Sequence, residues 1–79
     1  MDIEEAIKLR IQNLCKENDL TINGLSVRAG MPRSTLKNIV YGTSKNTGIV
    51  TIQLICDCLG ISIRDFFNDE LFDGLEVRD

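Results

Sequence analysis

Apolar residues recur at helical spacing in two stretches of this 79-residue chain. The first stretch, residues 2–18, has one at every third or fourth position: Ile3, Ile7, Ile11 and Leu14. The second stretch, residues 51–59, repeats this spacing: Ile52, Ile55, Cys56 and Leu59. Residues three or four apart share one face of a helix, so both stretches predict amphipathic helices with one buried face.

Between these stretches, residues 20–42 have the pattern of two short helices joined by a tight turn: LTINGLSVRAGMPRSTLKNIVYG. Thr21 can cap the first helix, because its hydroxyl accepts a hydrogen bond from a first-turn amide that has no partner within the helix. Gly30 ends that helix, since glycine adopts a left-handed backbone at no steric cost. Pro32 presets the backbone for the first turn of a second helix over residues 32–41.

This second helix has two chemically different faces, and Gly42 marks its C-terminal end. Its apolar residues share the face that we expect to be buried: Leu36, Ile39 and Val40. The opposite face carries hydrogen-bond donors and no carboxylate: Arg33, Ser34, Lys37 and Asn38. Such a polar face does not contribute to packing of the core, and its donors are suited to binding an anionic partner.

The remaining segments supply a loop and further helix ends. Residues 43–50 are mostly small and polar and contain no acid, which is typical of a turn-forming loop. Thr51 is the expected N-cap of the helix that follows, and Gly60 is its expected end. Ser62 and Asp65 have the spacing of a capping box, which predicts one more short helix.

The pair of helices at residues 20–42 resembles the helix-turn-helix of the lambda-repressor-like family, also called the Cro or XRE family. The matching features are Leu20-Thr21, Leu25 before the small Ser26, Ala29-Gly30 at the turn, Met31, and the run Arg33-Ser34-Thr35-Leu36. The resemblance extends over about residues 5–67 and implies an all-α fold, a compact bundle of five helices. In this family the second helix of the motif lies in the DNA major groove, and many members are transcriptional repressors.

The resemblance also implies which residues contact DNA. Base contacts are expected from the polar face of the second helix: Arg33, Ser34, Lys37 and Asn38. Backbone contacts are expected from residues around the motif: Arg10, Thr21, Asn23, Thr35, Tyr41, Thr43, Lys45 and Asn46. For Arg10 the alternative is a solvated side chain that pairs with an acid, and for Lys45 and Asn46 it is an ordinary loop.

Two positions depart from the family pattern. Ile22 stands where a glutamine that touches a phosphate is common, so that contact is not expected here. Ser26 replaces the commoner alanine, which keeps the site small enough for two helices to approach each other.

Charge is distributed unevenly along the chain. The formal net charge is −3 at pH 7, which by itself disfavours a nucleic-acid partner. Residues 20–56, however, contain four basic residues and no acid, whereas the segments before and after them carry net charges of −2 and −5. DNA responds to the field within about 8–10 Å, so this local positive excess favours DNA binding. Chance segregation of charge is the alternative explanation.

Composition narrows the class of protein. The apolar and charged fractions, 43% and 27%, are ordinary for a soluble globular chain of one domain. No apolar run approaches the roughly 20 residues of a membrane span and no secretory signal is visible, so we expect a cytoplasmic protein without membrane contact. The three cysteines are expected to serve as structural residues, with Cys15 and Cys56 buried and Cys58 partly exposed.

Two functions remain open at this point. The first is a small repressor that binds a palindromic operator in double-stranded DNA as a homodimer. The alternative is a protein-interaction module, such as an antitoxin-like partner of another protein. The chain has no histidine, no glycine-rich phosphate loop and no pairing of nucleophile with base, so we expect no enzyme activity, cofactor, metal or small-molecule ligand.

We divide the chain into a helix-turn-helix domain at residues 1–67, with its motif at 21–41, and an acidic tail at residues 68–79. The apolar residues of the tail could fold back, cover a second subunit or fray: Leu71, Phe72, Leu75 and Val77. Leu71 and Phe72 are the residues that we expect at or near a dimer contact.

Overall fold

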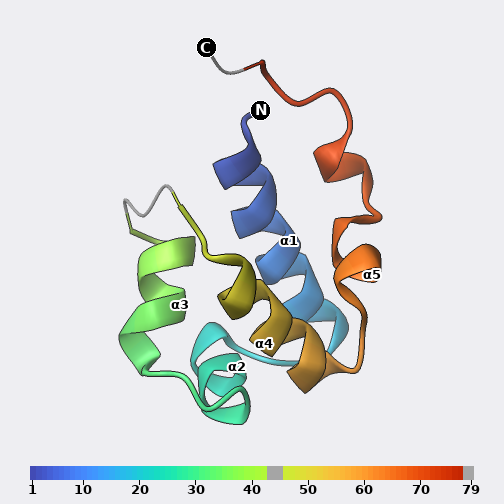
Figure 1. Cartoon of the computed structure of the whole chain (residues 1–79). Helices are drawn as coiled ribbons and strands as arrows, with labels where there is room; N and C mark the ends of the chain where they lie inside the picture. The colour runs from blue at the N-terminus through green and yellow to red at the C-terminus, as the bar shows by residue number, and fades with distance from the viewer. Residues whose placement is uncertain (43–45, 78–79) are drawn as a thin grey trace.

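A computed structural model of the chain describes residues 1–42 and 46–77. The helices are α1 (Ile3–Glu17), α2 (Ile22–Arg28), α3 (Arg33–Val40), α4 (Ile49–Leu59) and α5 (Ile63–Phe67), followed by the 3₁₀ helix η1 (Glu70–Phe72). α1 lies in the middle of the bundle, with α3 on one side and α5 on the other (Figure 1). The all-α five-helix fold expected from the sequence is confirmed. No helix in the described part is long and apolar enough to cross a membrane.

The apolar faces of the helices meet in one core. Both stripes predicted from the sequence contribute to it, and their innermost residues, Ile11 and Ile55, are fully buried. Phe66 of α5 closes the core and is also fully buried. Cys15 and Cys56 are buried as expected, and burial raises the pKa of both thiols, so they pack as neutral, apolar groups.

The turn between α2 and α3 is built as the sequence predicted. The Thr21 hydroxyl accepts a hydrogen bond from the Gly24 amide at 2.9 Å and caps α2. Gly30 has a left-handed backbone, with φ 68°, and the next amide, that of Met31, donates to the Ser26 carbonyl at 2.9 Å. This bond closes the helix end and turns the chain into α3. Ser26 itself is fully buried, consistent with the need for a small residue there.

Gly42 is needed for space rather than for a left-handed backbone. Its φ is not positive, unlike that of Gly30. A Cβ at Gly42 would lie 2.7 Å from the Asn38 carbonyl oxygen, which is closer than non-bonded atoms approach. The chain therefore leaves α3 so close to the last turn that only glycine fits.

The start of α4 differs from the prediction that Thr51 is its N-cap. The helix begins at Ile49, with Gly48 at the N-cap and no side-chain hydrogen bond. The earlier start gives the Ile52 amide a partner, the Gly48 carbonyl at 3.2 Å, which a start at Thr51 would not provide. The buried face of α4 is unchanged by this extension, because of the three added residues Ile49 and Val50 are exposed and Thr51 is only half-buried.

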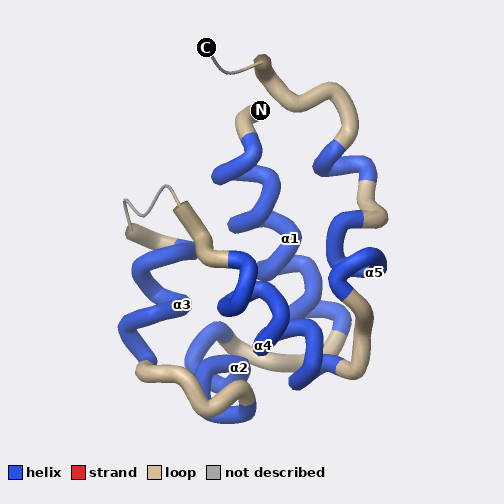
Figure 2. The backbone as a smooth tube through the Cα atoms, viewed as in Figure 1, coloured by secondary structure: helices blue, strands red, loops and turns tan. Residues whose placement is uncertain are grey.

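The tail folds back on the domain, one of the three outcomes that the sequence left open. Figure 2 shows the chain after α5 running back along α1 toward the N-terminus. Phe72 of η1 packs its ring against the rings of Phe66 and Phe67, with centroids 6.2 and 4.9 Å apart. Farther along, the N-terminal ammonium of Met1 forms an ion pair with Glu76 at 3.6 Å. Among the described residues of the tail, Leu71, Phe72 and Leu75 are thus half-buried, whereas Val77 is 93% exposed and does not pack on the bundle.

Candidate nucleic-acid interface

α3 presents its polar face to solvent. Its apolar residues, Leu36, Ile39 and Val40, are buried, and this packing fixes the rotation of the helix about its axis. All four expected base-contacting side chains are exposed as a result: Arg33, Ser34, Lys37 and Asn38. None of them has a hydrogen-bond or ion-pair partner among the described residues, so their donors are available to a ligand.

The rigidity of this face comes from tertiary contacts. A helix of eight residues is marginal in water by itself, so α3 depends on its packing against the core. At its start the Thr35 amide donates to the Pro32 carbonyl at 3.0 Å, which closes the first turn. Thr35 is half-buried at the edge of the polar face, whereas Arg33 in the same turn is exposed. The first turn of α3 therefore presents the Arg33 guanidinium to solvent.

Two of the expected backbone-contacting residues, Thr21 and Tyr41, line one cleft between α1, α2 and α3. Tyr41 follows directly on α3 and is 70% exposed. Two residues of α1 that the sequence did not single out, Gln12 and Lys16, line the same cleft. The apolar spacing of α1 predicts which of its residues are buried but contains no information about which of its exposed residues lie beside α2 and α3. Asn23 is exposed in the first turn of α2.

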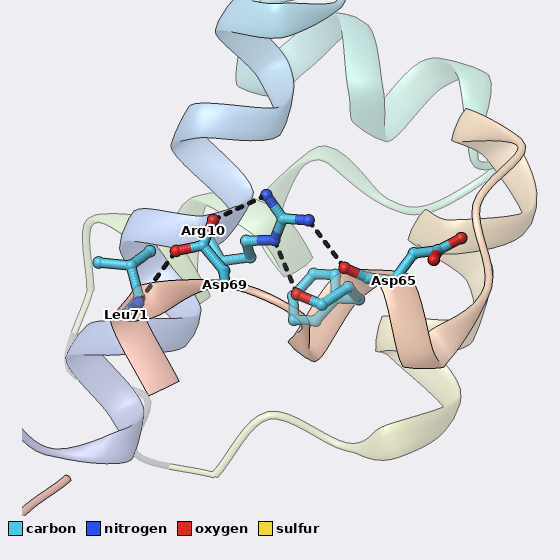
Figure 3. A network of polar contacts seen from close by, with 5 residues as sticks. Arg10, Asp65, Asp69 and Leu71 are labelled. Carbon is cyan, nitrogen blue, oxygen red and sulfur yellow. Dashed lines mark hydrogen bonds and ion pairs between the residues drawn. The ribbon is translucent and has the colours of Figure 1, made fainter. Parts of the chain in front are cut away.

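Arg10 points instead toward Asp65 and Asp69, as Figure 3 shows. It is only 8% exposed, and its Nε donates to the Phe66 carbonyl at 2.7 Å. Its two terminal nitrogens donate to the Asp65 carbonyl at 2.9 Å and to the Asp69 carboxylate at 3.2 Å. Of the two roles that the sequence left open, pairing with an acid is the one observed, although Arg10 is buried and not solvated, and Asp69 is only partly exposed. Its donors are committed to α5 and the tail, so we do not include Arg10 among the DNA contacts.

The loop after α3 is described in part. Asn46 is exposed ahead of α4. The expected contacts from Thr43 and Lys45 lie outside the described residues.

Comparisons with known proteins agree with this geometry. The family model of the Cro/C1-type HTH DNA-binding domain matches residues 10–71, a range that runs from α1 through η1. The crystal structure of the prophage Lp1 protein 11 is similar to this chain, with 33% sequence identity and a TM-score of 0.81. The match covers 95% of this chain and 100% of that one. A comparison with curated proteins gave no match. With more than half of its length matched by the family model, this chain belongs to the Cro/C1-type helix-turn-helix family of DNA-binding domains.

Proposed function

We propose that this protein is a sequence-specific transcriptional regulator, a small cytoplasmic repressor that binds a palindromic operator through α3. The observation that carries this proposal is the exposed face of α3, whose four polar side chains have free donors and no neighbouring carboxylate on that face. Membership of a DNA-binding family supports it. The protein acts by occupying its site and needs no catalytic group or cofactor.

Two different sets of residues contact the DNA bases and the DNA backbone. Arg33, in the first turn of α3, can donate both arms of its guanidinium to O6 and N7 of a guanine in the major groove. Ser34, Lys37 and Asn38 extend this reading along the helix. Contacts to phosphates fix the position of the protein without conveying sequence, and we assign them to the surrounding residues: Thr21, Asn23, Thr35, Tyr41, Thr43, Lys45 and Asn46.

The bound form is a homodimer. One recognition helix reads only a few base pairs, whereas two copies related by a two-fold axis double the contact and match a palindrome. From the sequence we expect Leu71 and Phe72 near the contact between subunits. Because Phe72 packs against Phe66 and Phe67 of its own chain, Leu71 is the residue of this pair that remains for a second copy.

The test begins with the selection of bound sites from a random DNA pool at near-physiological salt, which should enrich a two-fold symmetric sequence. Binding of Arg33→Ala and Lys45→Ala is then measured on that sequence and on scrambled DNA over a salt series. Arg33→Ala should cost about 1–3 kcal/mol on the selected site and relax the preference at one base pair. Lys45→Ala should weaken binding to all sequences alike and reduce the salt slope by about one.

Arg64→Ala is the matched control, because it removes an exposed positive charge from α5, on the opposite side of α1 from α3 (Figure 1). It should leave both affinity and preference close to those of the parent. If Arg33→Ala weakened both DNAs equally, Arg33 would be a backbone contact and reading would rest on Lys37 and Asn38. Absence of any salt-dependent DNA binding by the parent protein would instead favour the protein-interaction alternative.

A further inference from the structure

The cleft between α1, α2 and α3 gathers hydrogen-bond donors from three separate elements. Its polar residues are Gln12 and Lys16 from α1, Thr21 at the start of α2, and Tyr41 at the end of α3. Lys16 and Tyr41 are exposed, so the ammonium and phenol groups can both reach a ligand. The Thr21 oxygen accepts a hydrogen bond from the Gly24 amide, which leaves the hydroxyl proton free to be donated outward.

Among the residues that the structure describes, none with an acidic side chain lines this cleft, which sets it apart from other clefts on the surface. Three further clefts each include a carboxylate in their lining, contributed by Glu5, Asp65 or Asp69. Glu17 and Asp19 are close to Lys16 in sequence but do not line the cleft. In a chain with a net charge of −3, a concave site with a cation, neutral donors and no carboxylate favours an anionic ligand.

The distance between the cleft and the base-reading end of α3 is suitable for contact with a DNA strand. Eight helical residues span about 12 Å, so Tyr41 lies about one major-groove width beyond Arg33. A DNA strand that flanks the groove occupied by α3 would therefore pass close to the cleft. Phosphates on such a strand are bound in other proteins by lysine, amide and hydroxyl groups, the groups present here.

We propose that this cleft binds a phosphate of the DNA backbone, with Lys16 and Gln12 of α1 as contacts additional to Thr21 and Tyr41. The inference rests on the proposed function and deepens it, because it brings α1 into the DNA-binding surface. Lys16 supplies the charge that neutralises the phosphate, and Gln12 supplies a neutral donor beside it. Lys16 thus raises the affinity for every DNA sequence alike and does not contribute to sequence preference.

The alternative role for Lys16 is structural, since a positive charge in the last turn of α1 is favourable beside the helix C-terminus. Two variants separate the roles. Lys16→Ala should weaken binding to the selected operator and to scrambled DNA by the same factor, about fivefold at near-physiological salt, and lower the salt slope by about one. Lys16→Arg should restore both, and Gln12→Ala should weaken binding without changing the slope. Arg64→Ala again controls for the loss of one positive charge.

A second measurement identifies the contact directly. Operators with a single neutral methylphosphonate at each flanking position are bound to the parent protein and to Lys16→Ala. The parent should lose affinity at one flanking position in each half-site, the two being related by the two-fold axis, and that loss should disappear in Lys16→Ala because the partner of each phosphate is already missing. Circular dichroism melting of Lys16→Ala should match that of the parent closely enough that the folded fraction is unchanged during the assay.

The two proposals fail in different ways. If Lys16→Ala kept the parent's affinity and salt slope while Arg33→Ala lost sequence preference, the cleft would not be a phosphate site and the proposed function would stand. If the parent showed no salt-dependent binding to any DNA, the proposed function would fail and this inference with it. A loss of operator binding in Lys16→Ala that tracked a lower melting temperature, with an unchanged salt slope, would assign Lys16 the structural role.

Discussion

At the scale of single residues, the ends of three helices depend on a left-handed backbone. Asp19, Gly30 and Gly60 follow α1, α2 and α4 with φ values of 52°, 68° and 71°. For most residues with a Cβ this conformation costs about 1–2 kcal/mol, and aspartate and asparagine tolerate it better. The two glycines could be recognised from the sequence as helix ends. Asp19 could not, because aspartate is common in many other positions of turns and caps.

This geometry predicts how substitutions at Gly30 rank in stability. Gly30→Val should lower the free energy of unfolding by about 1–2 kcal/mol or more, because valine is β-branched and the backbone there is left-handed. Gly30→Asn should lose less, as the presence of Asp19 in the same conformation suggests. A Cβ at Gly30 meets no other atom within 4 Å, so the expected loss comes from backbone strain and not from a clash.

Gly48→Ser is the control for this series, since Gly48 has an ordinary φ and open space around it. Serine should keep or raise stability, because its hydroxyl can supply the side-chain cap that α4 lacks. Urea denaturation of all the variants gives the comparison. Equal stability of Gly30→Val and the parent would contradict the assignment of the turn.

At the scale of elements, Arg10 joins α1 to the C-terminal end of α5 and to the tail. Its guanidinium donates to the Phe66 carbonyl, for which the end of α5 supplies no main-chain donor, and to the Asp65 carbonyl, which also accepts from the Asn68 amide at 3.2 Å. The same group binds Asp69, whose other carboxylate oxygen accepts from the Leu71 amide at 2.9 Å and starts η1. One buried cation therefore positions α5, the following turn and η1 together.

Arg10 and Asp69, the two ends of this network, should contribute unequally to the stability of the fold. Arg10→Met should lower the free energy of unfolding by about 2 kcal/mol or more, because it removes all three hydrogen bonds and leaves the Phe66 carbonyl and the Asp69 carboxylate without the guanidinium that they bind. Asp69→Asn should cost about 1 kcal/mol, since the two carbonyl acceptors remain and Asp69 is partly hydrated. Urea denaturation measures both values. A larger loss in Asp69→Asn than in Arg10→Met would show that the ion pair, and not the carbonyl contacts, carries the network.

Local patterns predicted the elements well and long-range contacts poorly. The Thr21 cap, the Gly30 turn and the capping box of Ser62 with Asp65 depend on residues within a few positions of each other, and all three are present. The extra turn at the start of α4 was missed because neither Gly48 nor Ile49 carries a distinctive signal. The partners of Arg10 are 55 to 59 positions away, and spacing along one helix contains no information about them.

In the candidate site, too, the part formed by one segment could be predicted from the sequence, and the part that combines several elements could not. The base-reading face of α3 was predictable because its four residues share one helix and one side of it. The cleft that includes Lys16 combines three elements, and its lining depends on how α1 packs beside α2 and α3. A pattern within one segment cannot identify such a site.

At the scale of the whole molecule, the basic recognition helix and the acidic tail segment lie apart from each other. The polar face of α3 lies on one side of α1, and the acidic segment that contains η1 lies on the other (Figure 1). Asp69, Glu70, Asp73 and Glu76 of that segment give the chain its negative net charge. Their placement keeps the carboxylates away from the surface that we assign to DNA, so a negatively charged protein can still present a DNA-binding face.

The tail should therefore contribute to stability within the subunit, and this can be separated from self-association. Removing residues 68–79 should lower the free energy of unfolding by about 2 kcal/mol or more, because Phe72 leaves the phenylalanine cluster and Arg10 loses Asp69. At concentrations low enough for the parent to be monomeric this loss comes from contacts within one chain, and it should become larger at concentrations where the parent dimerises through Leu71. Urea denaturation at two concentrations measures it.

Self-association is better tested by a single substitution that keeps both of those contacts. Leu71→Asp places a charge on the tail residue that we propose at the dimer contact, and Val50→Asp does the same on α4, where Val50 is 66% exposed. Leu71→Asp should weaken dimerisation in sedimentation experiments and reduce operator affinity, whereas Val50→Asp should change neither. If Val50→Asp abolished the dimer and Leu71→Asp did not, the homodimer would stand but its contact would lie on α4. The tail would then act within its own subunit, through the contacts of Phe72, Asp69 and Glu76 with the bundle.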